Sequence, residues 1–290
     1  MRPIQILTVA AVAVFSSWGT YKVMNVGNRA MVMNGLEPAS KQTVLERIIE
    51  EGKLRCGYMS YAPYIEIDTV TGEATGVAVD MTEAIAKKIG VDVEWSQETG
   101  FGTFIEDIKA NRFDAVCAPI WKNASRATQV SFSIPYGYQT VEAWVRIDDD
   151  RFSSLTDINK ETVTISVTDG EMGETIANQS FPKAKQFSIP QSSPFSDLLM
   201  NVVTGKADVV FVEPKFVEDF LKNNPEILKK VALEKPLRAF PITMVVSKEA
   251  QDLKRVIDSA LEEMMNTAEM DEILIEHNRP DLFLKPTRSF

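Results

Sequence analysis

The chain has few of the residues that metal sites and hydrolytic active sites require. Its 290 residues include one histidine, His277, and two cysteines, Cys56 and Cys117. Protein zinc sites take their ligands mainly from Cys, His and carboxylate side chains, and a hydrolytic site needs a nucleophile beside a base. No such grouping occurs in the sequence, so we expect no metal, no cofactor and no catalytic residues.

Basic clusters are also missing. The chain has 31 Lys and Arg against 41 Asp and Glu, which gives a formal net charge of −10 at pH 7. The phosphates of a nucleic acid would be repelled over most of such a surface. We therefore exclude nucleic acid as a partner.

No hydrophobic run clearly reaches the roughly 20 residues of a membrane-spanning helix. The most apolar stretch, residues 4–18, follows a positive flank as in an export signal, but no small-x-small cleavage site follows it. Counting on to Met24 brings its length close to that of an anchor. We predict a cleaved signal peptide over residues 1–24, with an uncleaved anchor or a cytoplasmic protein with an unusual leader as alternatives. Residues 25–41 are predicted to be a linker.

The two cysteines lie in apolar, strand-like segments, 54–58 and 115–119, which we expect to be neighbours in one parallel sheet. A buried free cysteine behaves as a small hydrophobic residue. A disulfide would suit an oxidising compartment, yet a bridge between adjacent strands is geometrically demanding. We favour two buried free thiols and keep the disulfide as the alternative.

One motif occurs twice, in residues 108–117 and, about 94 residues later, in residues 202–211. Each copy has the end of an amphipathic helix, a basic turn, an Asp and an apolar strand. Arg126 follows the first strand and Glu213 the second. Ligands of open α/β sheets bind at the carboxyl ends of strands. Two similar lobes, with a cation on one wall of the cleft and an acid on the other, would suit a small zwitterion.

Helices and strands alternate along the rest of the chain, which predicts an α/β fold with mainly parallel sheets flanked by helices. We predict lobe I from residues 42–140 plus 240–290 and lobe II from residues 141–239. The chain would cross between the lobes twice, near 138–141 and 238–241, as a double hinge. Predicted helices span 44–51, 81–89 (capped by Asp80), 104–110, 172–178, 196–203, 215–223 and 252–266, and predicted strands span 54–58, 91–95, 114–119, 163–167, 209–212 and 240–247.

Four further motifs follow one another in a fixed order: Leu54-Arg55-Cys56-Gly57, Tyr61-Ala62-Pro63-Tyr64, Gly76-Val77-Ala78-Val79-Asp80-Met81, and Ser125-Arg126 through Phe132-Ser133-Ile134-Pro135-Tyr136. This ordered set resembles the family 3 periplasmic solute-binding proteins, the polar-amino-acid receptors of ABC transporters, over roughly residues 42–285. The resemblance implies a two-lobed, non-enzymatic, monomeric protein of the periplasm. It would capture an amino acid or another small carboxylate and deliver it to a membrane permease.

The resemblance also implies roles for two charged residues. In the family an Arg after the third strand of the first lobe grips the ligand's α-carboxylate, and Arg126 stands at that position. An Asp after the strand of the second lobe accepts the α-ammonium group, and here that residue is Glu213. The structural alternatives are, for Arg126, a surface Arg that caps a helix or pairs with an acid and, for Glu213, a salt bridge at the cleft rim or hinge.

Tyr61 and Phe101 match the aromatic residues that flank the ligand in the family, although aromatic side chains also serve as ordinary core. Gly170 and Gly173 open a helix of the second lobe, where amides could meet an anion, or they form a plain tight turn. The chain departs from the family at Trp121 and Met172, which replace small hydroxyl residues. Both are predicted pocket residues, and they favour an apolar or aromatic ligand, or another carboxylate.

Two other functions keep the same scaffold. Some relatives of the family are cyclohexadienyl dehydratases, and Glu174 aligns with their catalytic acid, although the Gly170-Glu171-Met172 lead-in differs from theirs. A stand-alone sensory binding protein is the other alternative. Turnover of prephenate would distinguish the enzyme from a binding protein.

Overall fold

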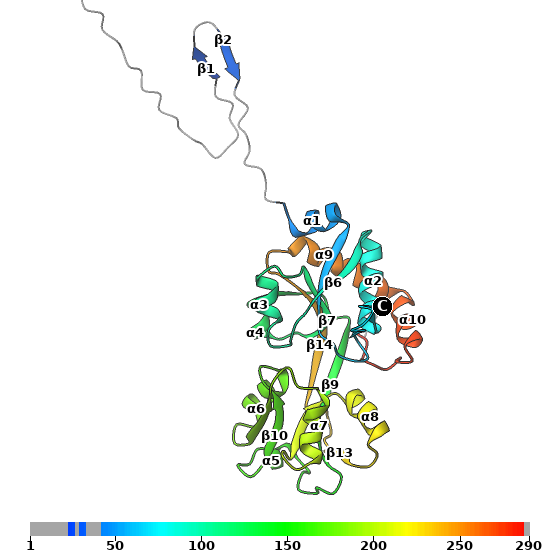
Figure 1. The fold of residues 1–290 in the computed structure, drawn as a ribbon. Helices are drawn as coiled ribbons and strands as arrows, with labels where there is room; N and C mark the ends of the chain where they lie inside the picture. Colours follow the sequence, from blue (N-terminus) through cyan, green and yellow to red (C-terminus); the bar gives the residue numbers. More distant parts are fainter. Residues whose placement is uncertain (1–22, 27–28, 33–41, 287–290) are drawn as a thin grey trace, which may run out of the picture. The chain divides into compact units, whose positions relative to one another are not determined.

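The computed structural model describes residues 23–26, 29–32 and 42–286 (Figure 1). Strands β1 (Val23–Val26) and β2 (Arg29–Val32) form an antiparallel pair within a separate unit, which ends at Gln42. The rest of the predicted leader and linker lies outside the described residues. In the described part, no helix is long and apolar enough to cross a membrane.

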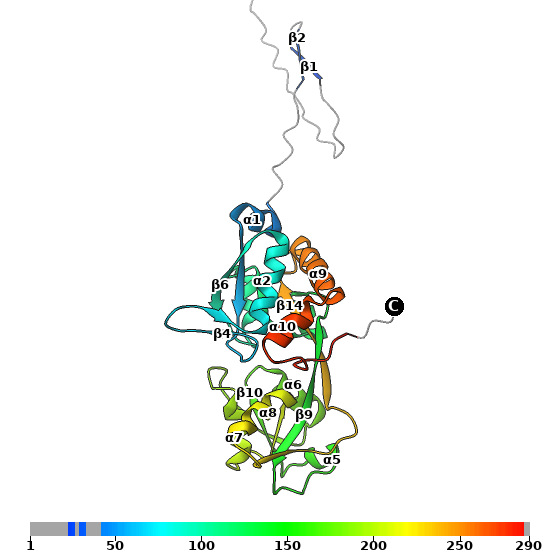
Figure 2. The ribbon, with the colours of Figure 1, turned by 90° about the vertical axis from the view of Figure 1, so that its right-hand side faces the viewer.

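The first lobe is a mainly parallel sheet covered by helices (Figures 1 and 2). Its strands lie in the order β14 (Arg238–Val246), β7, β3, β6, with β3 parallel to both β6 and β7. The elements are α1 (Val44–Glu51), β3 (Lys53–Tyr58), β4 (Glu66–Ile67), β5 (Ala74–Thr75), α2 (Val77–Ile89), β6 (Asp92–Glu98), α3 (Phe104–Lys109), β7 (Ala115–Trp121), α4 (Ala124–Ala127), β8 (Ser131–Phe132), α9 (Gln251–Asn266) and α10 (Glu269–Glu276).

The second lobe repeats this plan. Its strands lie in the order β11, β10, β12, β9, with β10 parallel to β11 and β12. The elements are α5 (Leu155–Ile158), β10 (Thr164–Thr168), α6 (Met172–Ser180), β11 (Lys185–Ile189), α7 (Ser196–Val203), β12 (Val209–Val212), α8 (Pro214–Asn223) and β13 (Leu228–Lys230).

Two long strands, β9 (Gly137–Arg146) and β14 (Arg238–Val246), join the lobes (Figure 1). They pair antiparallel with each other from Gly137↔Ile242 to Val141↔Arg238, and each then continues into one lobe's sheet. The prediction that both crossings are extended segments is confirmed. The two-lobed α/β fold is confirmed with it.

The apolar core is divided in the same way. One buried cluster draws on chain segments 48–136 and 242–283, while two others lie between Val141 and Leu237. Each lobe therefore buries its own hydrophobic core. The division at residues 140/141 and 239/240 stays a prediction.

One predicted helix start is wrong. Helix α2 begins at Val77, after Gly76, and Asp80 lies in its first turn rather than at its cap. Gly76 has φ 126° and lies against the carbonyls of Pro63 and Tyr64, and the amides of Val77 and Ala78 donate to those carbonyls. The neighbouring loop caps the helix here, so no capping side chain is needed.

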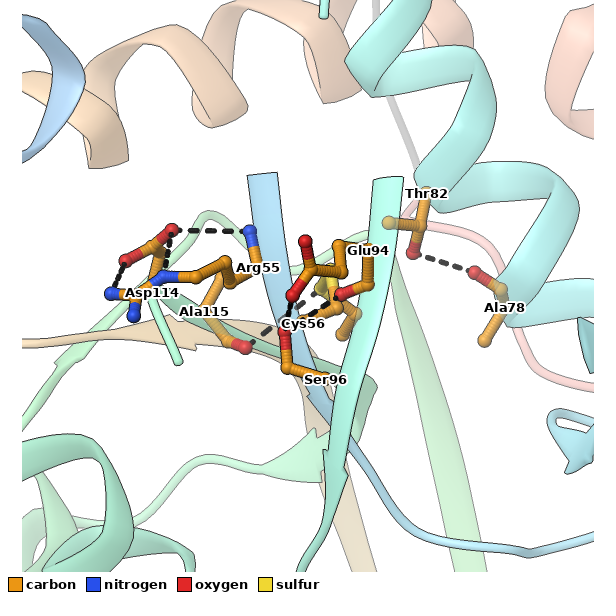
Figure 3. The surroundings of a disulfide bond; sticks show 9 residues. Arg55, Cys56, Ala78, Thr82, Glu94, Ser96, Asp114 and Ala115 are labelled. Carbon is orange, nitrogen blue, oxygen red and sulfur yellow. Dashed lines mark hydrogen bonds and ion pairs between the residues drawn. A yellow bond between two sulfur atoms is a disulfide. The ribbon is translucent and has the colours of Figure 1, made fainter. Parts of the chain in front are cut away.

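The cysteine prediction is also wrong, because Cys56 and Cys117 form a disulfide (Figure 3). Cys56 lies opposite Ala115 in the parallel pair of β3 and β7, so Cys117, two residues on, faces the same side of the sheet diagonally. The two Cα atoms are 5.6 Å apart, a usual separation for a disulfide. The diagonal offset makes a bridge between adjacent strands feasible.

The repeated Asp residues perform the same structural task in each lobe. Asp114 accepts from the backbone N–H of Arg55 (3.1 Å), and its own amide donates to the Arg55 carbonyl (2.8 Å). Asp208 pairs with Thr164 in the same two ways, at 2.9 and 2.7 Å. Two Arg side chains neutralise each carboxylate. Asp114 forms salt bridges with Arg47 and Arg55, the second of which is drawn in Figure 3. Asp208 forms salt bridges with Arg146 and Arg151. The Asp residues of the sequence repeat therefore stabilise the fold, and they lie at the amino ends of the strands.

We expect Asp114→Ala to destabilise the protein by about 3 kcal/mol, because it leaves two Arg side chains without their buried partner. Asp208→Ala should cost less, since the Asp208 side chain is 19% exposed and that of Asp114 only 2%. Urea unfolding followed by circular dichroism measures both variants. Equal losses, or no loss for Asp114→Ala, would contradict this assignment.

Candidate functional site

A pocket lies between the two lobes, at the carboxyl ends of β7, β10 and β12. Both lobes contribute side chains to its lining, and six of the seven predicted site residues are among them: Tyr61, Phe101, Trp121, Arg126, Met172 and Glu213. The remaining lining residues are Pro119, Gln139, Ser166, Val167, Thr168, Glu171, Gly173, Phe195, Leu198 and Phe211.

Arg126 is held in the first wall by several contacts. It lies in α4, which follows β7, and the side chain of Asn123 caps this short helix by accepting from the Arg126 amide (2.8 Å). The guanidinium donates to the carbonyls of Phe101 (2.9 Å) and Trp121 (3.3 Å) and lies 5.2 Å from the centroid of the Phe104 ring. Its remaining N–H groups are available to a ligand carboxylate. Burial lowers the pKa of Arg126, and Glu171 opposes that shift.

Glu213 forms part of the opposite wall. It follows β12 directly and stands at the N-cap of α8, where Pro214 occupies the first turn. Its side chain accepts a hydrogen bond from the Tyr61 hydroxyl across the cleft (3.2 Å), and the residue is 9% exposed. Burial raises the pKa of Glu213 to about 7, against the opposing effect of hydrogen bonds from its own backbone and Tyr61. Burial, followed by the neighbouring Glu213, also raises the pKa of Tyr61, so this hydroxyl remains a donor.

A second acid, Glu171, lines the same pocket and was not predicted. It is half-buried at the N-cap of α6, just after β10. Burial and then Glu213 raise the pKa of Glu171 to about 7, while Arg126 lowers it. Its position after a strand end could have been predicted from the rule that placed Arg126 and Glu213.

Aromatic rings make up much of the remaining wall. Tyr61 contacts Phe101 edge to face, with ring centroids 6.0 Å apart, and contacts Phe195 of the second lobe at 5.5 Å. Trp121 stacks on Phe240 at 4.6 Å, and its indole N–H donates to Gln139 (2.6 Å). Rings of this kind supply large apolar contact areas and attract cations on their faces.

The chain matches the family described as bacterial extracellular solute-binding proteins, family 3, over residues 54–278. It belongs to this family. The sequence resemblance is therefore confirmed, and the pocket between the lobes of this solute-binding protein can be compared with known relatives.

Three similar proteins illustrate the range of the family. The chain is 28% identical over 178 residues to a cyclohexadienyl dehydratase of Pseudomonas aeruginosa, a match that spans 60% of the chain and 64% of the enzyme. It is 25% identical to ABC transporter arginine-binding protein 1 of Escherichia coli, over 63% of the chain and 71% of that protein. The crystal structure of the ancestral amino acid-binding protein AncCDT-1, a precursor of cyclohexadienyl dehydratase, matches with TM-score 0.70 and 25% identity, over 81% of the chain and 98% of that structure.

The residues singled out around the start of α6 lie partly outside the pocket of this solute-binding protein. Gly170, with φ 73°, lies outside the pocket lining, and its amide donates to the carboxylate of Glu174 (2.8 Å). The tight-turn alternative accounts for this glycine. Glu174, the residue aligned with the dehydratase acid, also lies outside the lining, and Gly173 lies within it.

The lining of this solute-binding protein's pocket also holds polar residues that Trp121 and Met172 did not lead us to expect. Ser166, Thr168 and Gln139 line it together with the two acids. The hydroxyl groups of Ser166 and Thr168 supply donors that the sequence analysis counted as lost, whereas the amide of Gln139 is paired with Trp121 and Tyr64. The sequence reasoning missed these residues because it considered only the residues directly around Arg126 and at the start of α6.

Direct contacts join the lobes around the pocket. The Asn123 amide contacts the Met172 sulfur at 3.3 Å, and Arg279 forms a salt bridge with Asp219 of α8 at 2.8 Å. These contacts, with the Tyr61 to Glu213 hydrogen bond, hold the two walls against each other. The structure therefore shows the lobes in contact across the cleft.

Proposed function

We propose that this protein is a non-catalytic, extracytoplasmic solute-binding protein that captures an amino acid or related small carboxylate for an ABC transporter. The main support is that Arg126 and Glu213, from different lobes, line one pocket. The guanidinium offers a planar pair of donors to the ligand carboxylate, and Glu213 accepts from its ammonium group. Tyr61, Phe101 and Trp121 cover the apolar part of the ligand.

Ligand capture is proposed to stabilise the arrangement in which the lobes touch. A ligand can shift this equilibrium only through interactions that differ between the open and closed states. A carboxylate on Arg126 and an ammonium on Glu213 engage both walls together only when the lobes meet. The paired β9 and β14 are the segments about which the lobes would rotate.

We assign the protein to the periplasm, where its closed form would dock on a membrane permease as a monomer. The family description and the disulfide both support an oxidising location outside the cytoplasm. If the leader is retained, it would tether the protein to the inner membrane beside its transporter.

Isothermal titration calorimetry with the twenty amino acids tests this function. Protein unfolded in denaturant, dialysed and refolded would be free of copurified ligand. We expect at least one amino acid to bind with a dissociation constant in the micromolar range or below. Absence of binding by all twenty, with the circular dichroism spectrum of folded protein, would reject the amino-acid-binding function.

A second candidate is an enzyme of the cyclohexadienyl dehydratase type. The observation in its favour is the pair of carboxyl groups in the pocket, Glu171 and Glu213, whose pKa values of about 7 suit general acids. Against it, Glu174 points to the Gly170 amide and not into the pocket. Prephenate turnover above background, lost in Glu213→Gln, would favour the enzyme over the binding protein.

A further inference from the structure

The charges in the pocket do not balance for a neutral zwitterion. Arg126 contributes one positive charge, and Glu171 and Glu213 contribute two negative charges when ionised. A zwitterionic ligand adds no net charge, so it would leave one carboxylate uncompensated in a partly desolvated site. Uncompensated buried charge is costly, whereas a ligand of net charge +1 would neutralise the group.

Glu171 has the position expected of a ligand-contacting residue. Glu171 stands at the N-cap position of α6, but its side chain does not cap the helix. In the described part of the chain, its carboxylate makes no hydrogen bond and no ion pair within 4.0 Å. Arg126 likewise forms no ion pair with a carboxylate among the described residues, and its side chain donates only to two carbonyls. The two opposite charges therefore influence each other across the pocket without contact.

Glu171 also lies where the pocket meets a second, more polar hollow along the seam between the lobes. Tyr61, Phe101, Thr168 and Phe195 line both spaces together with Glu171. In the second hollow Arg112 forms a salt bridge with Asp107 at 2.7 Å. Glu98 also lines this hollow, and the Arg112–Asp107 pair does not neutralise its charge. A cation at this junction would meet a carboxylate and three aromatic side chains, whose ring faces attract cations.

We propose that Glu171 is a specificity-determining residue that contacts a cationic group on the ligand's side chain. The site would then select an amino acid of net charge +1 over an uncharged amino acid of the same length. This inference rests on the proposed amino-acid-binding function, with Arg126 on the α-carboxylate and Glu213 on the α-ammonium. It replaces the preference for an apolar or aromatic ligand that Trp121 and Met172 indicated.

The titration behaviour of the pocket supports this proposal. The groups that face Glu171 are Arg126 from α4, Glu213 before α8 and the Tyr61 hydroxyl, and both acids have a pKa raised to about 7. A cationic ligand favours the ionised acids, so its binding at pH 7 should release protons. An amino acid with an uncharged side chain favours ionisation of Glu213 alone, through its ammonium group, so it should release fewer protons than a cationic one.

Arginine and citrulline provide the sharpest test, because they have almost the same shape and differ in side-chain charge. Calorimetry in two buffers of different ionisation enthalpy gives both the affinity and the number of protons exchanged. We expect the wild-type protein to bind arginine at least tenfold more tightly than citrulline. In Glu171→Gln the ratio should fall to near one through loss of arginine affinity, and the number of protons released on arginine binding should fall to the share that Glu213 contributes.

The matched control is Glu174→Gln, which removes an acid of the same helix that lies outside the pocket lining. It should leave the preference for arginine unchanged. Equal affinities in the wild-type protein, a preference that survives in Glu171→Gln, or binding of uncharged amino acids alone would overturn this inference and leave the amino-acid-binding function intact. Failure of all amino acids to bind would instead reject that function.

Discussion

Arg126→Ala is expected to weaken binding of a carboxylate-bearing ligand about a thousandfold, or about 4 kcal/mol, while the protein still folds. Arg126 is 9% exposed, and its guanidinium is oriented by the carbonyls of Phe101 and Trp121. Its removal would leave a ligand carboxylate in a partly dry pocket beside two acids. Loss of attraction and desolvation therefore act in the same direction.

Calorimetry with the tightest-binding amino acid measures this loss, and circular dichroism checks the fold. Arg126→Lys should recover only part of the affinity, because an ammonium group cannot offer two parallel donors to a carboxylate. Arg255→Ala, on the exposed face of α9, is the control and should bind normally. Unchanged affinity in Arg126→Ala would assign Arg126 a structural role instead.

The parts of the site that were predictable follow directly from strand ends. Arg126 and Glu213 come after buried strands that the apolar pattern makes evident, and the topology brings the carboxyl ends of such strands together. Glu171 also follows a strand, β10. It was missed because the neighbouring glycines, Gly170 and Gly173, led us to interpret this turn through its backbone amides and not its side chains. Polar residues after every predicted strand should be considered as candidates.

Other features depend on contacts between distant segments. Phe195 precedes α7 and contacts Tyr61 of the first lobe, so only the closeness of the lobes reveals it as a pocket residue. The repeat correctly indicated two similar lobes, yet the Arg partners of Asp114 and Asp208 lie on other elements. Nothing in the spacing of the repeat indicates which cations approach it.

The disulfide shows how strand register decides a covalent bond. Adjacent parallel strands were predicted for the two cysteines, and this is correct for β3 and β7. The expectation of free thiols took a bridge between adjacent strands to be geometrically unfavourable. The diagonal offset of Cys117 from the residue opposite Cys56 cannot be obtained from hydrophobic patterning, which fixes the face of a strand but not its register.

Removal of the disulfide is expected to lower the free energy of unfolding by about 4 kcal/mol. The bond closes a loop whose ends are 61 residues apart in sequence, and a loop of this length restricts the unfolded chain by about that amount. Both cysteines are buried in the core of the first lobe, so Cys56→Ala with Cys117→Ala also loses some packing. The effect should appear as a lower urea midpoint for this lobe, with the fold retained.

Two comparisons separate the crosslink from the packing. Cys117→Ala alone already breaks the bond, so it should lose most of the stability that the double variant loses, and its remaining thiol should react with Ellman's reagent after unfolding. Reduction of the wild-type protein by dithiothreitol should lower the urea midpoint without any change of side chains beyond the sulfurs, which isolates the crosslink. If the unreduced wild-type protein exposes two reactive thiols when unfolded, the disulfide is not formed, and its loss cannot account for any difference in stability.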